Sequence, residues 1–163
     1  MLLGIISDTH DHIENIEKAK RVFEKRGASP VIHLGDYCAG PSVRAMEGMK
    51  VIGICGNNDG DLPRIMGNFQ KIGGDFRGEF CVLNFDHLNI ACYHGTVPDI
   101  VEALIDCKKY DVVLYGHTHK VRQETRDTTL VLNPGSAHGF DGDPATIALF
   151  DTQAKTAEIV ELH

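Results

Sequence analysis

The chain has 163 residues, of which 42% are hydrophobic and 24% are charged, and its formal net charge is -7. These values are typical of a soluble globular protein, so we expect one domain over residues 1–163 with enough apolar material for its own core. The negative charge argues against an extended nucleic-acid-binding surface, which is normally basic. It leaves room for a small phosphorylated substrate whose charge is offset by metal ions.

The cysteines and the first residues indicate a cytoplasmic protein. The five cysteines are scattered and form no C-x-x-C pair, which argues against both a disulfide framework and a zinc finger. The first residues lack the basic region and the long apolar segment of a signal peptide. No run approaches the 18 apolar residues typical of a membrane span.

The first half of the chain alternates apolar runs with amphipathic segments. Residues 1–6 are predicted to form a buried strand, and the residues from 13 onward a helix that Gly27 ends. A second strand is expected over 30–34, a short helix over 41–49 and a third strand over 51–55. This order of strands and helices is typical of a parallel sheet.

The middle of the chain is less regular, and the second half is rich in predicted strands. Residues 79–85 and 88–93 are expected to form two strands joined by a tight turn. A helix over 98–107 and a strand over 111–115 follow. The last predicted strands are 121–125, 129–132, 146–150 and 157–160, and their spacing suggests an antiparallel meander.

Side chains that can bind a metal follow five of these strands directly. Asp8 and His10 lie two residues apart, so on a strand end they would point the same way, and His117 and His119 have the same spacing. In an open α/β sheet, ligands bind beyond the carboxyl ends of the strands. Taken together, the five stretches predict a metal site: Asp8-x-His10, Gly35-Asp36, Gly56-Asn57-Asn58-Asp59, His94-Gly95 and Gly116-His117-x-His119.

The order of these stretches resembles the calcineurin-like metallophosphoesterase superfamily, and the resemblance covers nearly the whole chain. It is most similar to the small, single-domain bacterial and archaeal phosphodiesterases of that group. The stretches that carry this resemblance are Ser7–His10, Gly56–Asp59, Tyr115–His119 and Asn133–Ser136. The resemblance implies a four-layer α/β/β/α sandwich, formed by a single metallophosphoesterase domain, with two metal ions at the edge of the sheets.

The resemblance also implies the metal ligands. One ion would be held by Asp8, His10, Asp36 and His119, and the other by Asp36, Asn57, His94 and His117. A carboxylate shared by two cations offsets their repulsion, which agrees with Asp36 as the bridge. This donor set contains no thiolate and suits divalent transition metals, with Mn²⁺ expected first and Ni²⁺, Co²⁺, Fe²⁺ or Zn²⁺ as alternatives.

The expected reaction is hydrolysis of a small phosphodiester or nucleotide by a hydroxide that bridges the two metals. Asp36, Asn58 and Asp59 are the residues that we assign to catalysis. Many members of the superfamily read G-N-H-[DE], and here Asn58 takes the place of that histidine. Because an amide is no general acid, diesters with good leaving groups should be preferred over monoesters.

Two other functions are compatible with parts of the sequence, and some further polar residues are expected to lie near the metal site. A non-catalytic protein-binding scaffold, similar to the retromer subunit of the same fold, is the main alternative to an enzyme, and a homo-oligomer is left open. A metal-dependent nuclease is disfavoured by the acidic charge. Asp11, His12 and His33 are expected to support a metal ligand or, for Asp11, to cap the helix, and His138 is a candidate substrate contact.

Overall fold

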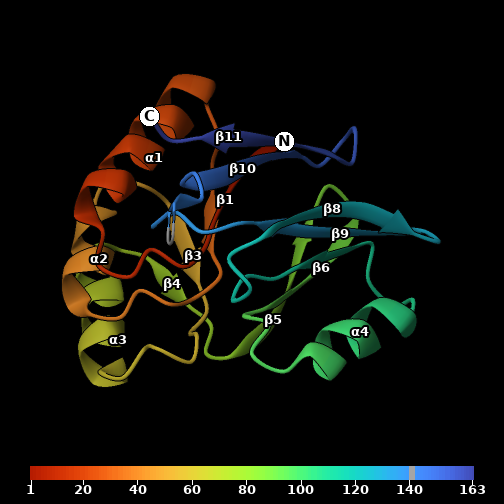
Figure 1. Cartoon of the computed structure of the whole chain (residues 1–163), viewed down its shortest axis with the longest axis horizontal. Coiled ribbons are helices and arrows are strands. Elements are labelled where there is room, and N and C mark those ends of the chain that lie inside the picture. The colour runs from red at the N-terminus through yellow and green to blue at the C-terminus, as the bar shows by residue number, and fades with distance from the viewer. Residues whose placement is uncertain (140–141) are drawn as a thin grey trace.

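The computed structural model of the chain describes residues 1–139 and 142–163, and the strands of that part form two sheets (Figure 1). One sheet has six strands in the order β11–β10–β1–β2–β3–β4, and the other has five in the order β5–β6–β7–β9–β8. The strands are β1 (Leu2–Ile6), β2 (Val31–His33), β3 (Val51–Gly53), β4 (Asp75–Phe76), β5 (Phe80–Phe85), β6 (Leu88–Tyr93), β7 (Val112–Leu114), β8 (Val121–Arg126), β9 (Thr129–Pro134), β10 (Thr146–Asp151) and β11 (Thr156–Glu161). The helices are α1 (Ile13–Arg26), α2 (Gly40–Ala45), α3 (Leu62–Lys71) and α4 (Pro98–Asp106).

The six-stranded sheet confirms the predicted alternation of strands and helices. β1 pairs with β2, β2 with β3 and β3 with β4, all in parallel, and α1, α2 and α3 are the crossover helices. Helix α1 ends where its sequence predicts, because Gly27 adopts a left-handed conformation with φ 67° and its amide closes the last turn. The β10–β11 hairpin completes this sheet by pairing β10 antiparallel to β1.

The five-stranded sheet is mixed. β5 and β6 form the predicted antiparallel hairpin, and both turn residues, Asp86 and His87, have positive φ. β6, β7 and β9 are parallel, with α4 as the crossover from β6 to β7, and β8 pairs antiparallel to β9 at the edge.

The two sheets pack face to face, and helices cover their outer faces (Figure 1). The largest buried cluster lies between the sheets and joins side chains such as Ile5 and Ile32 of one to Leu114 and Leu132 of the other. Helices α1 to α3 bury their apolar sides on the outside of the six-stranded sheet, and α4 does so on the five-stranded sheet. The arrangement confirms the predicted four-layer α/β/β/α sandwich.

Five details differ from the expectation drawn from the sequence. The four last strands form no meander, because the β8–β9 hairpin joins one sheet and the β10–β11 hairpin the other. Helix α3 and the short strand β4 were not predicted, and α2 ends at Ala45 rather than at Met49. The cap of α1 is His12, whose ring accepts a hydrogen bond from the Asn15 amide at 3.2 Å, and not Asp11.

The carboxyl ends of five parallel strands meet at one edge of the sandwich. β1, β2 and β3 of one sheet and β6 and β7 of the other each lead into a loop that carries predicted site residues. The contacts between these loops, described below, place the candidate site where the two sheets meet. Over the described residues, none of the helices has the length and apolar character needed to span a bilayer.

Candidate metal centre

The predicted ligands lie in tight loops beyond the strand ends. β1 ends at Ile6, so Asp8 and His10 do not share the face of a strand as predicted, although the two side chains do meet. β7 ends at Leu114, so the same prediction is wrong for His117 and His119. Left-handed backbone conformations bring them together instead. Each of these costs about 1–2 kcal/mol for a non-glycine residue, so the surrounding contacts must hold them. They occur at Asp8 (φ 53°), His10 (φ 41°), Asp36 (φ 59°), His117 (φ 65°) and His119 (φ 59°).

Backbone hydrogen bonds between the loops hold this conformation. The Asp8 amide donates to the carbonyl of Gly35 at 3.1 Å, and the His10 amide donates to that of Asp36 at 3.0 Å. The His117 amide donates to Asp8 Oδ2 at 3.0 Å. These bonds join the loops after β1, β2 and β7, and the last of them holds the Asp8 carboxylate in place before any ligand binds, which is the preorganisation that a metal site requires.

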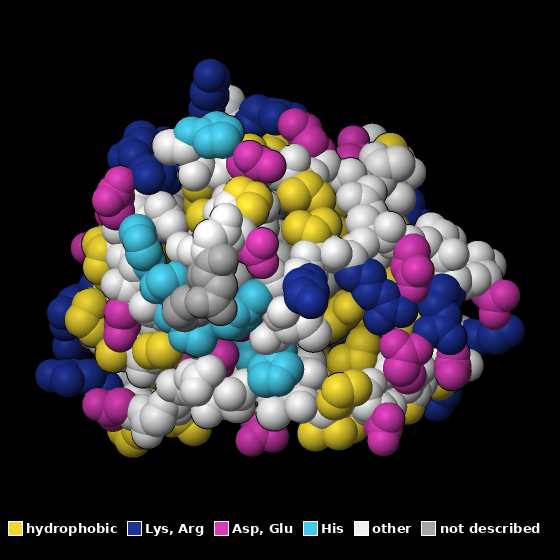
Figure 2. Space-filling view, viewed as in Figure 1, with side chains coloured by type: hydrophobic (Ala, Val, Ile, Leu, Met, Phe, Trp, Pro, Cys, Tyr) yellow, Lys and Arg dark blue, Asp and Glu magenta, His cyan; other side chains and the backbone are white. Residues whose placement is uncertain are grey.

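The side chains converge in two groups that share Asp36. Asp8, His10, Asp36 and His119 each offer an atom within 4.8 Å of the others, and Asp36, His94 and His117 do the same. His119 Nε2 lies 3.3 Å from Asp8 Oδ1, and His94 Nε2 lies 3.3 Å from Asp36 Oδ2. In the space-filling view, histidine side chains gather on one face of the molecule (Figure 2). Six of the seven predicted ligands thus lie together, in the two groups that the resemblance implies.

The electrostatics of the centre favour ionised carboxylates. Burial raises the pKa of Asp8, but the nearby imidazoles of His10, His119 and His94 outweigh it, so the net pKa lies well below the ordinary value. Burial also raises the pKa of Asp36, and contacts with His94 and Asn58 bring it below the ordinary value. These carboxylates in turn raise the pKa of His94 and His119. A divalent cation would compete with protons for the same imidazoles.

The orientation of His94 and two buried atoms fit a metal. The Leu34 carbonyl can only accept, so His94 Nδ1, at 2.7 Å from it, carries the proton and Nε2 faces the centre. Among the described residues, His94 Nε2 and Asp8 Oδ1 are buried without a hydrogen-bond partner, and they lie 3.9 Å apart. Buried polar atoms without partners are costly, and a cation between them would satisfy both. The carboxylate and imidazole donors therefore fit a divalent transition metal.

Asn58 and Asp59 both act on Asp36. The Asn58 amide donates to Asp36 Oδ1 and its side-chain Nδ2 donates to Asp36 Oδ2, both at 2.8 Å. Asp59 accepts from three backbone amides: Asp36 at 3.0 Å, Gly56 at 2.7 Å and Cys38 at 2.9 Å. Burial raises the pKa of Asp59, and these bonds partly offset it. In this structure Asn58 orients the carboxylate of Asp36, and Asp59 ties the loop after β2 to the loop after β3.

Other predicted residues have structural partners. Asn57 is exposed, and its Oδ1 accepts a hydrogen bond from the Thr96 hydroxyl at 3.5 Å. His33 is fully buried, lies 3.1 Å from Thr9 Oγ1 and stacks on Tyr37, and burial lowers its pKa to about 3. It supports the loop after β1 as a neutral ring.

Asp11 and His138 complete the set of predicted polar residues. Asp11 accepts from the Ser42 hydroxyl at 2.7 Å, so it supports the start of α2 rather than a ligand. His138 lies beside His10 and His12, with ring centroids 6.1 and 5.1 Å away. It therefore borders the centre on the side of His10, and its contact with the substrate stays a prediction.

Glycines allow the loops to approach each other closely. A Cβ on Gly56 would lie 2.2 Å from Asp36 Oδ1 and 2.8 Å from His94 Cε1. A Cβ on Gly116 would lie 1.9 Å from Ser7 Oγ and 2.7 Å from Asp8 Oδ2. Both sites are therefore restricted to glycine by the neighbouring loop rather than by their own backbone angles.

Cys38 is a neighbour of the centre that the sequence did not indicate. Its sulfur lies 3.1 Å from His10 Nδ1, on the side of the ring away from Asp36. Burial raises the pKa of this thiol to about 11, so it is a neutral partner of the ring and not a thiolate ligand. Its position after Asp36 was the only sequence signal, because a single cysteine in a loop has no distinctive pattern.

Comparisons with known proteins agree with this geometry. A family profile described as the calcineurin-like phosphoesterase superfamily domain matches residues 1–155. Phosphodiesterase MJ0936 of Methanocaldococcus jannaschii is 35% identical over 158 residues, 95% of each chain. A solved archaeal phosphodiesterase superposes with a TM-score of 0.94 at 34% identity, over 99% of this chain and 100% of that one. Vacuolar protein sorting 29 of Cryptosporidium parvum has a TM-score of 0.69 at 21% identity, over 98% and 95%, which shows the fold alone.

Proposed function

This chain belongs to the calcineurin-like phosphoesterase superfamily, and we propose that it is a phosphodiesterase that hydrolyses small phosphodiesters with two divalent metal ions. One observation carries the proposal: two groups of carboxylate and imidazole side chains converge on a shared, ionised Asp36. A dinuclear centre needs a bridging carboxylate, and this is the residue that the geometry offers.

We assign the proposed ligands as follows. Asp8, His10, Asp36 and His119 would hold one ion, and Asp36, His94 and His117 the other, with Asn57 as the fourth ligand that the resemblance to the family implies. Asn57 would have to give up its long contact with Thr96 to contribute its oxygen. Mn²⁺ is the metal that we propose first, with Ni²⁺, Co²⁺, Fe²⁺ or Zn²⁺ as alternatives that suit the same donors.

The chain's own residues define what the centre can do. When bound, two such ions supply an activated water and stabilise charge on the phosphate oxygens. The protein holds Asp36 with the two donors of Asn58, and it holds His94 with the carbonyl of Leu34. Asn58 has no proton to give to a leaving group at neutral pH. We therefore propose that diesters with good leaving groups are cleaved well and alkyl monoesters poorly.

Hydrolysis assays on metal-stripped protein test the proposal. Bis-p-nitrophenyl phosphate and p-nitrophenyl phosphate are compared with Mn²⁺, Ni²⁺, Co²⁺, Zn²⁺ or Mg²⁺ added back. We expect diester cleavage that requires a metal and falls by about 100-fold or more in Asp36→Asn. Asp61→Asn is the matched control, because Asp61 is an exposed cap of α3 that Asn can replace. Equal activity of the two variants would contradict the assignment of Asp36.

A non-catalytic scaffold of the same fold is the second candidate. The replacement of the usual histidine by Asn58 is compatible with it, but the six convergent ligands are what a phosphodiesterase needs. Metal binding without hydrolysis of any phosphate ester would favour the scaffold.

We also propose that residues 1–163 form one metallophosphoesterase domain, because one core cluster joins both sheets. The five cysteines are free, as is usual in the reducing cytoplasm, so we propose that the protein is cytoplasmic.

A further inference from the structure

We propose that a cavity beside the metal centre binds one organic substituent of the phosphodiester, and that this substituent is uncharged and about the size of a single ring. The inference rests on the proposed function and names the class of its substrate. The cavity has a volume of about 240 Å³ and opens to solvent between the loop after β3 and the start of α4. Pockets for drug-sized ligands measure about 300–1,000 Å³, so this one fits a ring rather than a whole nucleotide.

The cavity shares residues with the proposed centre. Asn57 and His94 line it, and both are proposed ligands of the same metal ion. Thr96, which donates to Asn57 Oδ1, lies on the same rim. A group that fills the cavity is therefore within reach of a phosphate at the centre, as an ester substituent would be.

Tyr93 and Val97 form an apolar wall of the cavity. Tyr93 is half-buried at the end of β6, and Val97 is 44% exposed at the cap of α4. The Tyr93 hydroxyl accepts a hydrogen bond from the Val97 amide at 3.2 Å. This bond occupies the polar end of the phenol and fixes the wall, so that the ring and the valine methyl groups are presented to a ligand.

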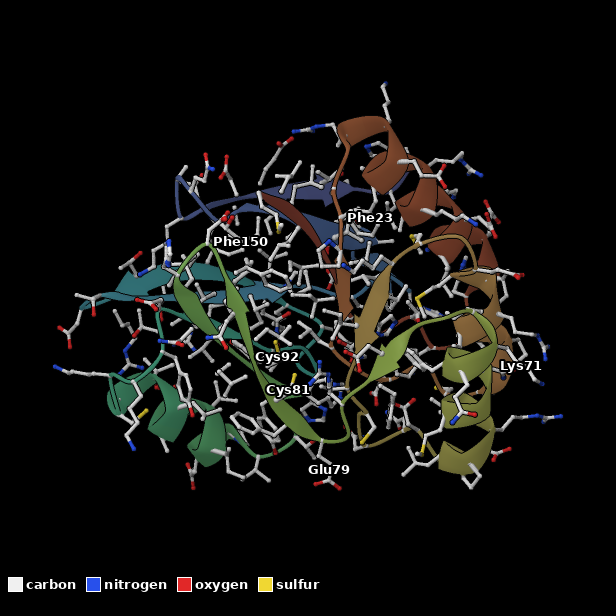
Figure 3. The ribbon with its side chains drawn as sticks, turned by 180° about the vertical axis from the view of Figure 1, so that it is seen from behind. Phe23, Lys71, Glu79, Cys81, Cys92 and Phe150 are labelled. Carbon is white, nitrogen blue, oxygen red and sulfur yellow. The ribbon has the colours of Figure 1, made fainter. Side chains whose placement is uncertain are left out.

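The charge around the cavity excludes an anionic substituent. The described residues that line it include Glu79 and no Lys or Arg. Glu79 is exposed just before β5, at the margin of the molecule (Figure 3). A second phosphate would be repelled by this carboxylate and would find no Lys or Arg side chain to pair with, whereas the donor groups of a neutral ring, such as a nucleobase, could bond to the carboxylate.

The cavity gives a physical reason for selecting diesters. A monoester whose only organic group leaves has no second substituent to bury, and its phosphate carries more negative charge. A diester can place one ring against Tyr93 and Val97 while its phosphate occupies the centre. The extra binding is available in the transition state because the phosphate remains attached to at least one substituent.

Steady-state kinetics with a matched pair of variants test the cavity. Val97→Trp fills it, and Ile100→Trp is the control, because Ile100 is 43% exposed on the same helix but does not line the cavity. The substrate is phenyl p-nitrophenyl phosphate with Mn²⁺. We expect Val97→Trp to lower kcat/KM by about tenfold, chiefly through KM, and Ile100→Trp to leave it within twofold. Equal kcat/KM values in the two variants would overturn the proposal.

A binding experiment tests, independently of turnover, whether the cavity takes up an uncharged ring. Spectra of ¹³C-methyl-labelled, Zn²⁺-loaded protein are recorded during titration with phenylphosphonate or methylphosphonate, neither of which is hydrolysed. We expect the Val97 methyl signals to shift with the phenyl compound and not with the methyl compound. Absence of this difference would overturn the cavity assignment even in an active enzyme. If the Val97 signals shift only with phenylphosphonate but the protein cleaves no diester, the cavity assignment is supported and the proposed phosphodiesterase activity is refuted.

Discussion

Replacing Asp59 by Asn should weaken both the fold and the metal centre. The carboxylate of Asp59 accepts three hydrogen bonds from the amides of Asp36, Gly56 and Cys38, at 2.7–3.0 Å. Asparagine offers one oxygen, which can serve Asp36 and Gly56, and then its NH₂ group faces the Cys38 amide. The part-buried Cys38 amide is left without a partner, and two charge-assisted bonds become neutral ones.

The expected loss follows from these changes. An unsatisfied buried donor costs about 1–3 kcal/mol, and two weakened bonds add about 1 kcal/mol. Burial raises the pKa of Asp59, which means that the charge itself is costly and that the neutral amide recovers part of the loss. We therefore expect the free energy of unfolding to fall by about 2–3 kcal/mol. The loops that Asp59 joins carry proposed ligands, so metal affinity should fall by about 10- to 100-fold.

Urea denaturation of the metal-free protein measures the first effect, and titration calorimetry with Mn²⁺ measures the second. Asp61→Asn removes the same charge two residues away at an exposed helix cap and should change both quantities little. If Asp59→Asn matches this control in both measurements, then Asp59 does not position the centre. If it lost activity alone, with unfolding and metal binding intact, the original assignment of Asp59 to catalysis would be favoured instead.

Three further predictions concern neighbours of the centre. Asn58→Ala removes the Nδ2 bond to Asp36 Oδ2, so calorimetry should show about tenfold weaker metal binding, whereas unchanged affinity would contradict this role. Gly56→Ala would force a Cβ against Asp36 and should destabilise the protein by about 1–3 kcal/mol in urea, whereas Gly60→Ala, which has open space, should not. His33 has a folded pKa of about 3, below its unfolded value, so stability falls as pH drops below 6.5, and His33→Phe should remove about 2–3 kcal/mol of the loss between pH 6.5 and 4.5. Parallel stability–pH profiles of the two proteins would refute the last prediction.

The order of strands and polar loops in the sequence was enough to predict that these side chains meet at one edge of the sandwich. Short apolar runs predict strands, and a polar loop after each strand predicts side chains at a common edge whenever the strands are parallel. That reasoning found Asp8, Asp36 and His94, which come from three separate strands, because each follows its strand directly. This prediction does not depend on the conformation of the loops, because it needs only the residue at which each strand ends.

The loop geometry could not be read from the sequence. Asp8 and His10 were expected to share the face of a strand, but both lie beyond β1 in left-handed conformations. Such conformations are unfavourable locally and persist because bonds from other loops impose them. The roles of Asn58 and Asp59 were hidden for the same reason, because their partner Asp36 is 22 or 23 residues away.

Tertiary structure alone also decided where the last four strands lie. The β8–β9 and β10–β11 hairpins each combine one almost fully buried strand with one half-exposed strand. Their local patterns are therefore alike and cannot say which sheet each hairpin joins. The buried strand β9 pairs with β7, and β10 pairs with β1, because each needs a buried neighbour in its own sheet. Sequence pattern specifies that a strand is buried, whereas its partner is chosen by packing between segments far apart in the chain.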